Sequence, residues 1–186
     1  MIKTRMRVSI DTGHWGARAA CGFMLTAALV RLWYYLTGRP EGTELWLHLW
    51  LPVLAAAAFL AGMAAGDRWA RPASMLSVVL GVVFFILKAQ TFTPVHKILC
   101  TILYLAVLVL YNATVMGFLP TKKLLYPLFG LPLLYHIFVE DTKLYLFADP
   151  PVPVWHWLPE ISVLCIMAAL FFTAVAMKKN PVRRGE

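Results

Sequence analysis

Long apolar runs separated by short polar clusters are the feature that most constrains the fold of this 186-residue chain. A helix needs roughly 20 apolar residues to cross about 30 Å of hydrocarbon, and the runs approach that length. Hydrophobic residues make up 61% of the chain and charged residues 14%, whereas a soluble domain averages about 25% charged residues. A chain this apolar cannot cover itself with a polar surface in water. The composition therefore predicts an all-α integral membrane protein with one polytopic domain over residues 1–186.

Helix start and stop signals divide the chain into six apolar segments. Gly38 and Pro40 close the first, Thr93 and Pro94 provide an N-cap and a first-turn proline for the fourth, and Pro159 opens the sixth. We therefore predict six transmembrane helices, over about residues 17–37, 46–66, 73–88, 93–119, 120–141 and 158–177.

Basic residues cluster at alternate ends of these segments, which fixes their orientation. Positive charge is retained on the cytoplasmic side, so both termini should be cytoplasmic, and we expect the cytoplasmic membrane of a bacterium. The chain carries a net charge of +8, but its basic residues form no single stripe with interleaved aromatics, so nucleic acid is not an expected partner. The clusters lie before the first segment and after the second, fourth and sixth: Lys3, Arg5, Arg7 and Arg18; Arg68 and Arg71; Lys122 and Lys123; Lys178, Lys179, Arg183 and Arg184.

The fifth segment is interrupted by Pro127, Gly130 and Pro132, which predicts a kinked helix. A proline inside a helix frees backbone carbonyls, which must then be satisfied within the protein or by a water-lined cavity. Interrupted spans of this kind are often solute-binding sites in membrane proteins. The alternative is a kink that only serves packing against neighbouring helices.

Ionisable residues gather on the outer side of the predicted membrane. His136 and Glu140 are spaced i,i+4, so they share a helix face, and the carboxylate could orient the imidazole. Arg31 lies about 9 Å inside the first span, so it must snorkel outward or pair with an acid such as Glu160 or Glu140. Simpler explanations exist, because boundary histidines are commonly hydrated and Glu160 occupies a first turn, where the helix dipole favours an acid. The predicted ligand-binding residues are His136, Glu140, Arg31, His48, Glu160 and Tyr135.

These features favour a protein that binds or transports a small solute through an outward-facing polar pocket. Its expected partners are the lipid bilayer, a small-molecule ligand, and either partner membrane subunits or further copies of the chain. The size and span number are similar to those of the membrane substrate-binding subunits of energy-coupling-factor vitamin transporters. That similarity is one of architecture, without a shared motif.

Two other classes remain open. In the first, a membrane haem or metal redox protein, two of the outer histidines would be axial ligands, or a metal would be bound by His96, Cys100 and His156. In the second, an intramembrane enzyme, His96 would act as base and Cys100 as nucleophile. No ligand pair has diagnostic spacing, no supporting catalytic motif accompanies His96 and Cys100, and the sequence identifies no cofactor. We therefore expect that the protein is not an enzyme.

Overall fold

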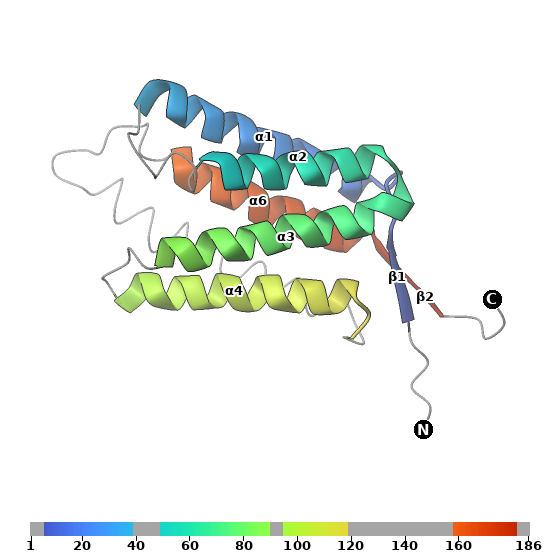
Figure 1. The fold of residues 1–186 in the computed structure, drawn as a ribbon. Helices are drawn as coiled ribbons and strands as arrows, with labels where there is room; N and C mark the ends of the chain where they lie inside the picture. The colour runs from blue at the N-terminus through green and yellow to red at the C-terminus, as the bar shows by residue number, and fades with distance from the viewer. Residues whose placement is uncertain (1–5, 39–48, 90–94, 119–157, 182–186) are drawn as a thin grey trace.

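The fold is a bundle of helices with a small sheet at one end, as Figure 1 shows in this computed structural model. The structure describes residues 6–38, 49–89, 95–118 and 158–181. This part of the chain contains five helices and two strands, so the prediction of a mainly helical fold is confirmed. The elements are β1 (Met6–Ile10), α1 (Trp15–Gly38), α2 (Leu51–Ala64), α3 (Asp67–Ala89), α4 (Val95–Val115), α6 (Leu158–Ala176) and β2 (Met177–Pro181).

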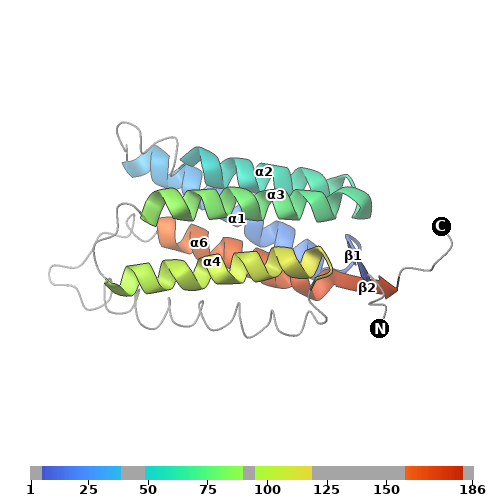
Figure 2. The same cartoon turned by 60° about the horizontal axis from the view of Figure 1, so that its bottom comes forward.

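The described helices alternate in direction along the chain from α1 to α4. In Figure 1, α1 and α3 run away from the strands, whereas α2, α4 and α6 run toward them. We name the end that carries β1 and β2 the strand end, and the opposite end the far end. Helix α1 packs against α6 and α2, and α3 packs against α2 and α4; Figure 2 shows the same bundle turned. The predicted fifth span and its kink lie outside the described residues.

Two glycines set helix ends that the sequence placed only approximately. Gly66 adopts a φ of 93°, which permits the tight connection between α2 and α3. At the end of α4, Gly117 adopts a φ of 83° and its N–H donates to the carbonyl of Thr114 at 3.0 Å. The N–H of Phe118 reaches back to the carbonyl of Ala113 at 2.9 Å, which completes a Schellman end. The fourth helix therefore ends at Val115, before the expected limit of residue 119.

The third helix begins earlier than predicted. The sequence analysis placed its start after Pro72, but α3 begins at Asp67 and carries Pro72 inside it. Asp67 lies in the first turn, where the helix dipole favours a carboxylate. A proline this close to a helix start removes a single backbone bond near the strand end of the bundle, so the helix continues through it.

The two strands were not predicted. Strand β1 pairs antiparallel with β2, with Val8 opposite Lys179 and Ile10 opposite Met177. Val8 and Ile10 are both buried, so this ribbon closes the strand end of the bundle. The sequence MRVSI alternates apolar and polar residues, and that period of two is the signal that could have identified the strand.

Length and hydropathy single out one described helix that could cross a membrane, the stretch Trp15–Thr37 near the N-terminus. This is weak support for a membrane protein, and it does not support six spans. The other apolar stretches are shorter, because α2 extends only about 21 Å at 1.5 Å per residue and α3 begins with charged residues. These shorter stretches are Leu51–Ala64, Leu105–Val115 and Ile161–Ala176.

Small residues allow the helices to approach closely. A Cβ added at Gly62 of α2 would lie 1.9 Å from the Cβ of Ala73 on α3. A Cβ added at Gly16 of α1 would lie 2.8 Å from the carbonyl oxygen of Phe172 on α6. Close backbone approach of this kind is the usual means by which helices associate where no water drives them together.

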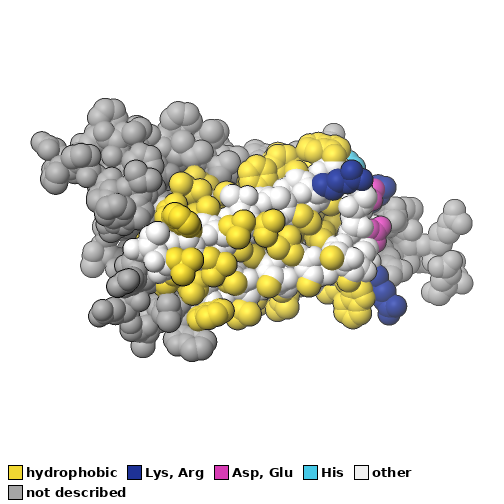
Figure 3. Space-filling model, turned by 90° about the horizontal axis from the view of Figure 1, so that it is seen from above, with side chains coloured by type: hydrophobic (Ala, Val, Ile, Leu, Met, Phe, Trp, Pro, Cys, Tyr) yellow, Lys and Arg dark blue, Asp and Glu magenta, His cyan; other side chains and the backbone are white. Residues whose placement is uncertain are grey.

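The surface of the bundle is apolar along its length and charged at one end. Figure 3 shows hydrophobic side chains over the described body, and basic and acidic side chains together at one end. Large apolar side chains are exposed on several helices, including Leu29 and Trp33 of α1, Leu54 of α2, Leu76 of α3 and Val109 of α4. Most of the buried polar side chains that the structure describes carry a hydroxyl group. The side chain of Arg31 is buried as well.

Candidate functional site

Arg31 occupies a core position of α1. The residues before it on the same face recur every three or four positions and are all buried: Ala17, Ala20, Met24 and Ala27. Arg31 continues this stripe and is 1% exposed. The sequence left two options, snorkelling outward or pairing with an acid, and this burial excludes the first.

A small cavity adjoins Arg31 between the helices. Its volume is about 30 Å³, and its lining comes from all five described helices. Arg31 and Ser77 are the polar members of that lining, and the remainder is apolar, including Pro52, Leu108 and Met167. Since a water molecule needs about 10–15 Å³ of such space, the cavity has room for about two water molecules or one small chemical group. The described part of the site is thus a buried cation with a confined space beside it.

A hydrogen bond between α1 and α6 shows which part of α6 lies level with Arg31. The hydroxyl of Ser162 donates to the backbone carbonyl of Ala27 at 3.0 Å, and both residues are buried. Ala27 lies one turn before Arg31, and the two helices are antiparallel (Figure 1), so the first turn of α6 is level with Arg31. That turn contains Glu160, one of the two acids proposed to pair with Arg31. The side chain of Glu160 is outside what the structure describes, so this pairing stays a prediction.

A second polar cluster lies deeper in the bundle, toward the strand end. Tyr111 of α4 is fully buried, and its hydroxyl lies near the buried hydroxyls of Ser74 of α3 and Thr173 of α6. The hydroxyl of Ser74 donates to the carbonyl of Arg71 at 2.9 Å, and that of Thr173 to the carbonyl of Ala169 at 2.7 Å. The cluster thus brings hydroxyl groups from three helices together in the bundle interior.

The strand end carries a cluster of charges, of which the sequence analysis used only Lys178, as a topology signal. The ammonium of Lys178 lies 2.6 Å from a carboxylate oxygen of Asp11. The backbone N–H and the hydroxyl of Thr12 both donate to Oδ1 of Asp67, at 2.8 and 2.5 Å. We name Asp11, Thr12, Asp67 and Lys178 the strand-end cluster. It joins the turn between β1 and α1 to the start of α3 and to β2, and the Asp-Thr-Gly sequence of that turn was the available signal.

Hydrogen bonds shift the pKa values of this cluster. The bond from Lys178 lowers the pKa of Asp11, and the two bonds from Thr12 lower the pKa of Asp67. The same bond to Asp11 raises the pKa of Lys178. All three groups are therefore held in their charged forms at neutral pH.

The remaining predicted site residues are not tested by the described part of the chain. His96 and Cys100 lie on α4 near the far end, but their side chains are not described. Among the residues that the structure describes, no group of three or more His, Cys, Asp or Glu side chains is placed to hold a metal ion. The predicted residues outside the described ranges are His48, Tyr135, His136, Glu140 and His156.

Comparisons with known proteins add no further identification: no family model matches the chain, and no curated protein or solved structure is significantly similar to it.

Proposed function

We propose that this chain is a six-span integral membrane protein that binds a small anionic solute, with Arg31 as the cation that receives its carboxylate or phosphate group. The observation that carries this proposal is the complete burial of Arg31 beside a cavity whose walls are otherwise almost entirely apolar. An ionisable residue inside a membrane bundle is costly and is commonly part of a binding or transport site. A guanidinium also offers the paired donors that match a carboxylate or phosphate.

The apolar outer surface and the helix directions support the membrane placement. Helices α4 and α6 run in the same direction (Figure 1), so an alternating six-span topology requires one crossing between them. The apolar segment 120–141 is the part of the sequence that would provide it. The predicted outer residues His136 and Glu140 belong to this segment, and in this proposal they line the outer part of the pocket above Arg31.

The principal alternative role for Arg31 is structural, as half of an ion pair with Glu160 that holds α1 to α6. The two roles differ in what a charge-removing substitution changes. Loss of a structural pair lowers stability whether or not a solute is present, because it leaves a buried charge without its partner. Loss of a binding residue removes the bound solute and the stabilisation that the solute provides.

The test is native mass spectrometry and thermal unfolding of the whole protein in mild detergent. We expect wild-type protein to carry an added mass from a bound organic anion, and Arg31→Met to lose it. Arg31→Lys should retain part of the binding, since it keeps the charge but not the paired donors. Arg18→Met is the matched control, because Arg18 lies on the same helix but is exposed.

Three outcomes would count against the proposal. Wild-type protein without any added mass, in several mild detergents, would remove its main support. An added mass that survives Arg31→Met would place the solute elsewhere. Greater destabilisation of Arg31→Met than of Arg31→Lys, with no change in bound mass, would assign Arg31 to the structural pair.

A further inference from the structure

A groove at the strand end is separate from the Arg31 cavity. It lies between β1 and the first turns of α3, and its volume is about 770 Å³, within the usual size range of ligand pockets. Ser9 of β1 lines one side, and Arg68, Arg71, Pro72 and Met75 of α3 line the other. The groove therefore has a polar and cationic part next to an apolar wall.

The charge balance of this groove favours an anion. Its one carboxylate, Asp67, already accepts two hydrogen bonds from Thr12 through the same oxygen. Arg68 and Arg71 are spaced i,i+3, so they lie on neighbouring positions of one helix face. Among the described residues, no carboxylate forms an ion pair with either of them. Two guanidinium groups thus face the groove against one carboxylate that is already engaged.

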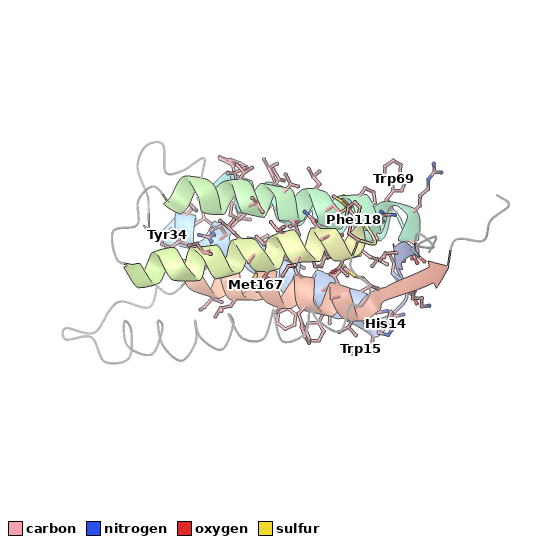
Figure 4. All side chains as sticks on the ribbon, turned by 90° about the horizontal axis from the view of Figure 1, so that it is seen from below. His14, Trp15, Tyr34, Trp69, Phe118 and Met167 are labelled. Carbon is pink, nitrogen blue, oxygen red and sulfur yellow. The ribbon has the colours of Figure 1, made fainter. Side chains whose placement is uncertain are left out.

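Exposed tryptophans place the groove at the level of a membrane interface. Trp69, between the two arginines in sequence, is 56% exposed, and Trp15 at the start of α1 is 60% exposed. Figure 4 shows both tryptophans at the strand end, with Trp15 beside His14 and Trp69 on the other side of the bundle. Tryptophan is enriched where hydrocarbon meets headgroups. Further along α3, Leu76 and Val79 are exposed and apolar, so the surface becomes hydrophobic within two turns of Arg71.

We propose that this groove binds the headgroup phosphate of an anionic phospholipid in the cytoplasmic leaflet. The arginine pair receives the phosphate, the hydroxyl of Ser9 is available to the polar headgroup, and Pro72 and Met75 contact the glycerol region. The acyl chains then follow the apolar surface of α3 at Leu76. This occupant matches both the cationic and the apolar parts of the groove, whereas a soluble phosphate matches only the first. The inference rests on the membrane placement proposed above but not on solute binding at Arg31.

The test uses the full chain in mild detergent, titrated with dioleoyl phosphatidylglycerol or dioleoyl phosphatidylcholine and observed by native mass spectrometry. We expect wild-type protein to retain phosphatidylglycerol in preference to phosphatidylcholine. Since each cation near an anionic lipid surface contributes about 1 kcal/mol, Arg68→Gln and Arg71→Gln should each weaken retention about fivefold, and the double variant about thirtyfold. Arg18→Gln removes an exposed cation outside the groove and should change retention little.

Several results would overturn the inference. They are equal retention of the two lipids by wild-type protein, equal weakening by Arg18→Gln and the groove variants, and displacement of phosphatidylglycerol by millimolar inorganic phosphate. The last would assign the groove to a soluble phosphate compound. Unfolding temperatures of all variants are measured in parallel, and Arg68→Lys and Arg71→Lys provide charge-retaining variants if the glutamines disturb folding. A groove that selects the phosphate by paired donors should lose part of its retention in these lysine variants too.

Discussion

The bundle interior and the strand end use similar polar groups in opposite surroundings. In the interior, the hydroxyl of Ser162 bonds a carbonyl of α1, and both groups are buried. At the strand end, Asp11 and Lys178 approach to 2.6 Å, but the two side chains remain 25% and 61% exposed. Salt does not screen a buried hydrogen bond, and water does not replace it when one partner is removed. Exposed ion pairs contribute little to stability, and salt weakens them. We therefore expect the interior to contribute most of the stability, and the strand-end cluster mainly to hold the β1–α1 turn against α3 and β2.

The largest difference between the two regions should appear when a methyl group is added to a glycine. Gly62→Ala places a Cβ 1.9 Å from that of Ala73, so α2 and α3 must separate, and we expect a loss of about 2–3 kcal/mol or failure to fold. Gly13→Ala at the strand end should be nearly neutral, because the nearest atom to its Cβ, Oδ1 of Asp11, is 3.4 Å away.

Thermal and denaturant unfolding in detergent measure these differences. Gly22→Ala is a second control, since it lies within α1 and its Cβ meets nothing within 4 Å. It should stabilise the protein by about 0.5–1 kcal/mol through backbone entropy. Equal tolerance of alanine at Gly62 and Gly22 would show that the interior is not close-packed at this contact.

Removal of single interior hydroxyls should have an intermediate effect. Ser162→Ala removes the buried bond to the carbonyl of Ala27. It should lower the free energy of unfolding by about 0.5–1.5 kcal/mol, the usual range for one intramolecular hydrogen bond. Thr26→Ala is the control, because the exposed Thr26 hydroxyl bonds only within its own helix. A loss for Thr26→Ala as large as that for Ser162→Ala would contradict the distinction between buried and exposed bonds.

The smallest effect should come from the strand-end cluster, and it should depend on pH. The pKa values of Asp11 and Asp67 are lowered on folding, so their contribution is complete above the ordinary value of 3.8 and is lost as the pH falls through the folded values. The pKa of Lys178 is raised, so its contribution is present below 10.5 and is lost as the pH rises through the folded value. Between about pH 5 and 9 the cluster should contribute a constant amount.

Unfolding temperatures of wild-type protein and Asp11→Asn test this prediction. Their difference should be smaller than the effect of Ser162→Ala, constant near neutral pH, reduced below about pH 4, and reduced by added salt. The pair Asp11→Asn and Lys178→Gln completes a double-mutant cycle that isolates the ion pair. A difference that persists unchanged in strong acid would assign the effect of Asp11 to its backbone turn instead of its charge.

The sequence predicted most of the helices and little of the site. Apolar periodicity and capping signals placed α1, α2 and α6 within a few residues, because those signals act locally. The early start of α3 at Asp67 was missed, since a proline near a helix start is compatible with either boundary. Most of the predicted ligand-binding residues fall outside the described ranges, so the outer pocket stays a prediction. Arg31 is the predicted site residue whose side chain the structure describes, and it lies buried in the bundle interior.

The sequence alone indicated that this chain is mostly apolar helix and that its basic residues fall in short clusters between the apolar segments. Hydrophobic period and charge order are properties of neighbouring residues, and they are sufficient for that conclusion. The tertiary structure alone decided that Arg31 faces the interior, that β1 pairs with β2, and which groups the hydroxyls of Thr12 and Ser162 bond. These partners are 55 and 135 residues apart in the chain. The environment of a polar group depends on which distant segment lies opposite it, and only the packed bundle determines that.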